Sequence, residues 1–260
     1  MAAAAEVPMN WSTPLLTKGV STEIRMGFVR KVYALVTCQL LATFILAAPI
    51  AAMGPFWAMQ CHWLSYVGFG LYLGTVLVAS WWRNMLRTTP WNYIALFAIT
   101  VSMSIMIGLT SAMYTWESVL LAAGLTSLIF MSLTVIAWKT STDFTGWAPY
   151  LYGAGLLFFF FALAVMSLSM FGVRVDMLVT FLDFCGAAFF VIFIIVDTQM
   201  ILGEWGGHKL QFQVDDYCLG ALQLYLDFGD MFLYILKLVG VQAPGVDLAC
   251  SDKKKKDKET

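Results

Sequence analysis

Seven long apolar stretches run through the chain, separated by short polar connections. Each is close to the ~20 mainly apolar residues that a helix needs to cross a bilayer. The stretches are residues 32–53, 64–82, 91–110, 117–138, 147–171, 178–202 and 217–241. Most of the tryptophans fall at or just beyond the end of a stretch, where an indole combines an apolar body with a hydrated N–H group. The pattern predicts an all-α integral membrane protein, a bundle of seven transmembrane helices.

The short connections favour a single membrane domain, which we place at residues 25–241. We expect residues 1–24 to form a flexible cytosolic N-terminus and residues 242–260 to form a polar, lysine-rich tail.

Composition supports the membrane assignment and excludes several classes of site. The chain is 60% hydrophobic and 12% charged, whereas soluble domains contain about 25% charged residues. A soluble globular domain is therefore excluded. Two histidines, five cysteines without paired spacing and no nucleotide-binding loop predict no cofactor and no nucleic-acid partner, so the bilayer is the first expected partner.

Basic residues in the connections predict the orientation. They precede the first stretch and fall in the second, fourth and sixth connections, whereas the first and third have none, which places the N-terminus in the cytosol. Seven crossings would then place Lys253 to Lys256 on the opposite side, against the same preference. The seventh stretch also carries Asp227, Asp230 and Lys237, so we expect a seventh helix that is either central or partly re-entrant.

Four acidic residues lie inside the last two stretches, Asp183 and Asp197 in the sixth and Asp227 and Asp230 in the seventh. Each ionised aspartate at mid-bilayer costs about 2.5–3.5 kcal/mol, and such groups normally face the interior of a bundle. Asp197 lies fifteen residues before Phe212 and Asp227 fifteen after it. An antiparallel hairpin centred there brings both to a similar depth. Asp183 and Asp197 are near enough to one helix face to line one path.

Two carboxylates in a poorly hydrated site cannot ionise independently, so they titrate as a unit. Protonated, they share a hydrogen bond and join two helices; ionised, they repel each other and attract a hard cation such as Ca²⁺. Asp197 and Asp227 are thus the predicted pH sensor, gate and transient Ca²⁺ ligands, and Asp183 and Asp230 are auxiliary acids. A pair that only joins the helices is the structural alternative. Arg83 is either a cytosolic anchor or a counter-ion to the pair.

Six sets of short segments stand out between about residues 25 and 240. They are Gly27-Phe28-Val29-Arg30-Lys31-Val32-Tyr33, Pro90-Trp91-Asn92, Glu117-Ser118-Val119-Leu120-Leu121-Ala122-Ala123-Gly124, Asp143-Phe144-Thr145, Val196-Asp197-Thr198-Gln199 with Gly203, and Leu224-Tyr225-Leu226-Asp227 with Phe232-Leu233-Tyr234-Ile235-Leu236. Together, and in this order, they resemble the Lifeguard branch of the transmembrane Bax-inhibitor-motif family.

The resemblance implies a seven-helix fold, a Ca²⁺ leak from intracellular stores and suppression of cell death, with membrane-protein partners in cell-death control. The family's paired aspartates, a proposed pH sensor and pore gate, fall on Asp197 and Asp227. An arginine in the second span that pairs with them in related proteins has no mid-helix match here, and Arg83 is a displaced candidate. Asp183 and Asp230 are not usual in the family.

The lysines near the C-terminus are a candidate targeting signal. Lys256 and Lys258 resemble a dilysine retrieval signal, which favours the endoplasmic reticulum over the Golgi or the plasma membrane. A solvated charge run or contact with anionic lipid is the alternative. Because retrieval signals are read from the cytosol, this address conflicts with seven full crossings.

Three functions compete at this point. The first is a pH-sensitive calcium leak channel of an intracellular membrane that lowers store calcium and suppresses cell death, with Ca²⁺ as the permeant ion. The second is a non-conducting scaffold that regulates cell-death proteins. The third is an intramembrane aspartyl protease, but its G-x-G-D motif is incomplete because Asp227 and Phe228 precede Gly229. We therefore expect no enzymatic activity.

Overall fold

The computed structural model describes residues 22–82, 85–140, 142–203 and 212–246. Within these ranges the regular structure is helical, apart from one isolated bridge between Tyr114 and Gln242. The helices are α1 (Thr22–Ala52), α2 (Gly54–Gln60), α3 (Trp63–Trp81), α4 (Trp91–Ser111), α5 (Trp116–Lys139), α6 (Ala148–Met170), α7 (Asp176–Leu202) and α8 (Tyr217–Val239). In the described connections, single turns of 3₁₀ helix are η1 (Met85–Arg87), η2 (Thr145–Trp147) and η4 (Val214–Asp216).

The predicted all-α multi-pass membrane fold is confirmed. Among the described helices, six are each long and apolar enough to cross a membrane, and α2 with α3 forms a seventh span that is bent by 68°. The bend was not predicted. It lies at Cys61 and His62, between the end of α2 and the start of α3. A separate turn precedes α2, where Gly54 has a φ of 79°, which side-chain-bearing residues rarely adopt, and Pro55 occupies the first turn of the helix.

α1 begins ten residues before the apolar stretch that predicts it. Charged residues in this first part hide the helix from a search for apolar runs, but Phe28 and Val32 lie one turn apart and are both buried. The Nζ atom of Lys31 lies 5.2 Å from the ring centre of Tyr217, at the start of α8. The first turns of α1 are therefore helical because they pack on the bundle.

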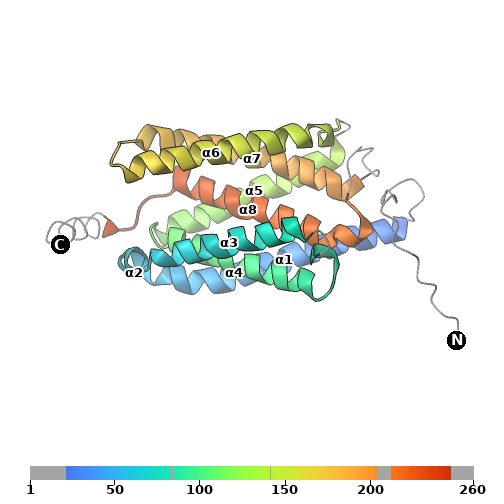
Figure 1. The fold of residues 1–260 in the computed structure, drawn as a ribbon, viewed down its shortest axis with the longest axis horizontal. Helices are drawn as coiled ribbons and strands as arrows, with labels where there is room; N and C mark the ends of the chain where they lie inside the picture. Colours follow the sequence, from blue (N-terminus) through green and yellow to red (C-terminus); the bar gives the residue numbers. More distant parts are fainter. Residues whose placement is uncertain (1–21, 83–84, 141, 204–211, 247–260) are drawn as a thin grey trace.

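α8 is the central helix of the bundle. It packs against α1, α4, α5 and α7, while α3 and α6 lie outside on α4 and α7. Figure 1 shows α6 and α7 on one side, α5 and α8 in the middle, and α1, α3 and α4 on the other side. In the most apolar window of α8, 61% of the residues are buried, against 11% in α6. The helix also runs the length of the bundle, so the structure selects the central alternative over the re-entrant one.

The outward surface is apolar, as a lipid-facing surface must be. Phe44, Phe97 and Leu157 are all more than two-thirds exposed. The interior instead contains hydroxyl groups, for example on Thr100 and Ser104 of α4, which donate to backbone carbonyls one turn earlier at 2.7 and 2.6 Å. These bonds satisfy the hydroxyl groups without water.

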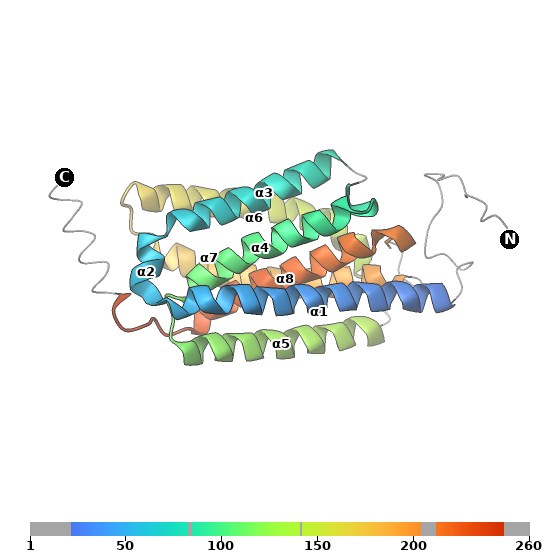
Figure 2. The same ribbon diagram turned by 90° about the horizontal axis from the view of Figure 1, so that it is seen from below.

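Residues after α8 pack against the connection between α4 and α5. The backbone N–H of Thr115 donates to Val241 O at 3.0 Å, and that of Ala243 donates to Met113 O at 2.9 Å. The described structure therefore continues past residue 241 to Val246, and the remainder of the expected tail, 247–260, lies outside the described residues. α1 begins and α8 ends at opposite ends of the bundle (Figure 1 and Figure 2).

Candidate functional site

The structure brings Asp197 and Asp227 together at the centre of the bundle. Asp197 lies on α7 and Asp227 on α8, two helices that pack antiparallel along much of their length (Figure 1). Their carboxyl groups lie within side-chain hydrogen-bonding reach of each other. Asp197 is 1% exposed and Asp227 is 5% exposed, so water does not replace this contact. We call these two residues the aspartate pair.

The aspartate pair has few other polar contacts. Oδ1 of Asp197 and Oδ2 of Asp227 are buried, and neither has a hydrogen-bond partner of standard geometry in the described part of the chain. Two ionised carboxylates in this setting would repel each other with little to compensate. A single proton held between them would give one carboxyl group a donor and the other an acceptor. The site therefore suits a change in protonation better than a fixed ion pair.

The last turns of α7 hold Asp197 rigidly. Every residue from Val196 to Leu202 is buried. Gln199, two positions after Asp197, receives a hydrogen bond from the N–H of Phe144 at 2.9 Å and donates to Thr142 O at 2.9 Å. These two bonds tie α7 to the connection between α5 and α6. A rotation of α7 that turned Asp197 away from α8 would therefore break them.

Tyrosines from the outer helices lie near the aspartate pair. Tyr152 of α6 interacts electrostatically with both aspartates, and its hydroxyl accepts a hydrogen bond from Gln223 Nε2 at 2.9 Å. Tyr72 of α3 lies within electrostatic range of Asp227 and Asp230. Polar groups thus approach the pair from α3 and α6, the two outermost spans.

Both auxiliary acids interact with a lysine, and Asp230 also lies within electrostatic range of Asp227. Lys237 of α8 donates to Oδ1 of Asp183 at 3.3 Å, and its Nζ atom lies 5.2 Å from the ring centre of Tyr234. Asp230 is half-buried and interacts electrostatically with the same lysine. Sequence reasoning noted Lys237 only as a charge in a poorly apolar helix. Its seven-residue spacing from Asp230, two turns on one helix face, is the signal that would have linked the two.

Arg83, the candidate for either a cytosolic anchor or a counter-ion, lies outside the described residues, as do Lys256 and Lys258. Arg87, from the same connection as Arg83, pairs with Asp216. Its Nε and Nη2 atoms donate to the two carboxylate oxygens of Asp216 at 2.6 and 3.1 Å. Asp216 directly precedes α8, so this contact, which sequence reasoning missed, anchors the start of the central helix.

Two buried hydroxyl contacts join α1 to its neighbours and were also missed. Thr43 Oγ1 and the Tyr225 hydroxyl are 2.7 Å apart, and Gln39 Nε2 donates to Thr100 Oγ1 at 3.1 Å. Gln39 and Thr43 are one turn apart within an apolar stretch, and that spacing was the available signal.

The acids do not form a ready-made metal site. In the described part of the chain, no three His, Cys, Asp or Glu side chains gather closely enough to hold a metal ion. Bound Ca²⁺ takes six to eight oxygen ligands. The aspartate pair can supply only part of such a shell.

Comparison with known proteins places the whole bundle in one family. The profile of the family described as "Inhibitor of apoptosis-promoting Bax1" matches residues 25–243, which include α8 and the aspartate pair. The chain belongs to this Bax-inhibitor family. Its relatives include human protein lifeguard 3, with 30% identity over 84% of this chain and 70% of the relative, and mouse protein lifeguard 3, with 28% identity over the same shares. Protein LIFEGUARD 4 of Arabidopsis thaliana is 30% identical over 84% of this chain and 86% of that relative.

The predicted resemblance to Lifeguard proteins is therefore confirmed. As a Bax-inhibitor family member, the chain is a multi-pass membrane protein of an anti-apoptotic family.

Proposed function

We propose that this Bax-inhibitor family member is a pH-sensitive calcium leak channel gated by the aspartate pair. The observation that carries the proposal is the contact between Asp197 and Asp227 inside the bundle. Two neighbouring carboxyl groups are buried between the central helix and α7, each with an oxygen that lacks a partner of standard geometry. Such intramembrane acids are costly, and they normally mark ion or proton pathways.

In the closed state, one proton joins the two carboxyl groups and holds α7 against α8. Loss of that proton leaves two negative charges in a poorly hydrated site, and their repulsion separates the helices. The same charges then attract Ca²⁺, whose preferred ligands are oxygen atoms. Flux is thus expected to rise with pH, because deprotonation both opens the path and creates the cation site.

Asp183 and Asp230 assist on the side of the aspartate pair that faces the C-terminal end of α8. Asp230 lies one turn after Asp227, and Asp183 of α7 contacts Lys237 near the end of α8, so their charge attracts cations towards the pair. Lys237 offsets part of that charge through its contact with Asp183. Tyr72 and Tyr152 line the approaches to the pair.

The proposed biological role follows from a calcium leak across the membrane of an intracellular calcium store. A lower calcium content in the store weakens death signals that depend on calcium release. We place the protein in an endomembrane, with the endoplasmic reticulum favoured over the Golgi and the plasma membrane. In this proposal it is not an enzyme, needs no cofactor beyond the permeant Ca²⁺, and acts alongside membrane-protein partners in cell-death control.

The test is Ca²⁺ flux into proteoliposomes that contain the purified protein, measured from pH 5 to pH 8. Wild-type flux should rise with pH. Asp197→Asn and Asp227→Asn each replace a titrating group with a neutral amide of the same shape, so flux should stay near the closed level at every pH.

Asp215→Asn is the matched control, because Asp215 is exposed near the start of α8 and takes no part in the pair. Its flux should follow the wild type. An unchanged pH profile in both pair variants contradicts the gate. The absence of flux from folded protein at any pH contradicts the channel and leaves the scaffold function.

A further inference from the structure

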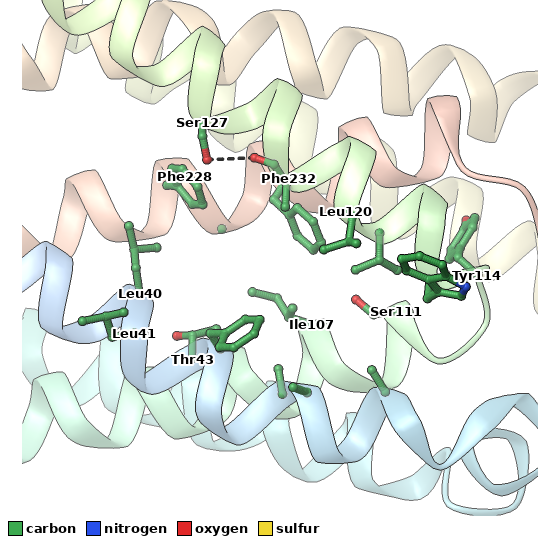
Figure 3. A pocket seen from close by; sticks show the side chains of 18 of the residues that line it. Leu40, Leu41, Thr43, Ile107, Ser111, Tyr114, Leu120, Ser127, Phe228 and Phe232 are labelled. Carbon is green, nitrogen blue, oxygen red and sulfur yellow. Dashed lines mark hydrogen bonds between the residues drawn. The ribbon is translucent and has the colours of Figure 1, made fainter.

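A long cavity opens between α1 and α5, and neither member of the aspartate pair is among the residues that line it. Its volume is about 630 Å³, within the range of about 300–1,000 Å³ typical of small-molecule sites. Figure 3 shows α1 and α5 as its two walls and α8 behind them. We call this cavity the α1–α5 groove.

The groove lies along the helices rather than across them. On α1 it extends from Thr37 to Ala52, a rise of about 22 Å at 1.5 Å per residue. The hydrocarbon core of a bilayer is about 30 Å thick, so the groove exceeds the depth of one leaflet. Its rim residues Phe44 and Leu120 are more than half exposed. In a chain that spans a membrane, a groove with this outward opening meets lipid and not water.

One end of the groove contains an unsatisfied polar group. Ser111, the last residue of α4, is 4% exposed, and its Oγ atom has no hydrogen-bond partner among the described residues. Figure 3 shows its hydroxyl group pointing into the groove. Leaving a buried hydroxyl unpaired is unfavourable, so an occupant that accepts its hydrogen bond gains affinity. Tyr114 and Trp116 line the same end, and aromatic residues of this kind mark the depth of the lipid head groups.

The lining fits one flexible chain with a single polar end. Ala47, Ala48, Ala51 and Ala52 form much of the α1 wall, and Ala123 lies on the α5 wall. These small side chains leave room in the part of the groove towards Ser111, and larger apolar side chains such as Leu40, Leu41 and Phe44 line the α1 wall further along. Away from Ser111, the Tyr225 hydroxyl on the floor is already paired with Thr43.

We propose that the α1–α5 groove binds one glycerolipid from the surrounding bilayer. Its acyl chain lies between α1 and α5 on the α8 residues Phe228, Gly229 and Phe232. An ester carbonyl oxygen of the lipid accepts the hydrogen bond of Ser111. The inference is independent of the calcium proposal, because it rests on the groove and on Ser111 alone. A bound lipid would also pack directly on the helix that carries Asp227.

The test uses phosphatidylcholine with a photoactivatable diazirine on one acyl chain, mixed at low fraction into phosphatidylcholine proteoliposomes. After illumination, mass spectrometry maps the labelled residues of the full-length protein. Labelling should concentrate on the groove walls, residues 37–52 and 116–127, above the level on the outer face of α6. Ala123→Phe fills the groove and should reduce that labelling to the level on α6.

Two further variants separate the possible outcomes. Leu128→Phe adds a ring on the exposed face of α5, outside the groove, and should leave labelling unchanged. Ser111→Ala keeps the groove open but removes the hydroxyl, which should weaken retention of the labelled lipid about fivefold, the effect of one hydrogen bond. Circular dichroism checks that each variant is folded.

Uniform labelling of the groove and α6, unchanged by Ala123→Phe, would overturn the proposal. So would a photoactivatable sterol that labels the groove and displaces the phosphatidylcholine probe, because the occupant would then be a sterol. Retention that is unaffected by Ser111→Ala would overturn the assigned hydrogen bond.

Discussion

Arg87 and Asp216 show how one residue pair can position the central helix. The guanidinium group donates to both carboxylate oxygens, a geometry that a lysine cannot reproduce. Asp216 also receives the N–H of Gln213 at 2.9 Å and is 5% exposed. Removal of Arg87 would leave the buried carboxylate of Asp216 without its positively charged partner at the start of α8.

We expect Arg87→Met to lower the free energy of unfolding by about 1–3 kcal/mol, the usual range for a lost hydrogen bond to a charged group. Thermal unfolding of the purified protein in detergent measures the change. Arg30→Met is the control, because Arg30 is exposed on α1, and it should change stability by less than about 0.5 kcal/mol. In a double-mutant cycle with Asp216→Asn, the two effects should be less than additive. Additive effects would show that the pair contributes nothing.

At the scale of helices, the close approach of α7 and α8 depends on Gly186. A Cβ atom at this position would lie 2.6 Å from the ring of Tyr234 on α8. The ring has little room to move, because it stacks on Phe190 with centres 5.9 Å apart and meets Phe158 edge-on at 6.4 Å. The glycine thus lets the two helices that carry the aspartate pair pack tightly along their length.

Gly186→Ala should therefore destabilise the protein by about 1–3 kcal/mol, the usual cost of overpacking. The measurement is again thermal unfolding in detergent. Gly124→Ala is the matched control on α5, because a Cβ atom there meets nothing within 4 Å. That control should be neutral or stabilising by up to about 1 kcal/mol, since alanine favours a helix over glycine. Equal destabilisation by both substitutions would refute the close-packing argument.

At the scale of the whole molecule, the first and last long helices of the chain start and finish at opposite ends of the bundle. α1 begins at one end of the bundle and α8 finishes at the other (Figure 1). Among the described residues, most basic side chains gather where α1 begins, namely Arg25, Arg30, Lys31, Arg87 and Lys139, whereas Arg174 and Lys237 lie towards the other end. This asymmetry favours a cytosolic start for α1. Residue 246 then lies on the opposite side of the membrane.

An epitope tag before Met1 should be digested by protease added to sealed microsomes, and a tag after Thr260 should be protected until detergent is added. In that topology Lys256 and Lys258 cannot act as a cytosolic retrieval signal. Replacing both with serine should leave the cellular location unchanged, as judged by fluorescence microscopy. Digestion of both tags in sealed microsomes would contradict seven full crossings.

Much of the fold could be predicted from local pattern alone. The length of each apolar run and the fixed rise of a helix predict where a span begins and ends, as the close match of 91–110 to α4 shows. The boundaries are wrong where packing overrides the apolar pattern, as at the start of α1, and the pattern does not record the bend between α2 and α3.

The sequence by itself determined the membrane fold, the family and the depth at which Asp197 can meet Asp227, because each follows from composition, motif or counting along a hairpin. Only the tertiary structure decided that α8 is central, that Lys237 joins Asp183, and that Arg87 joins Asp216. Those contacts depend on how each helix is rotated against its neighbours. That rotation is set by side-chain packing between segments far apart in the chain, which no local pattern records.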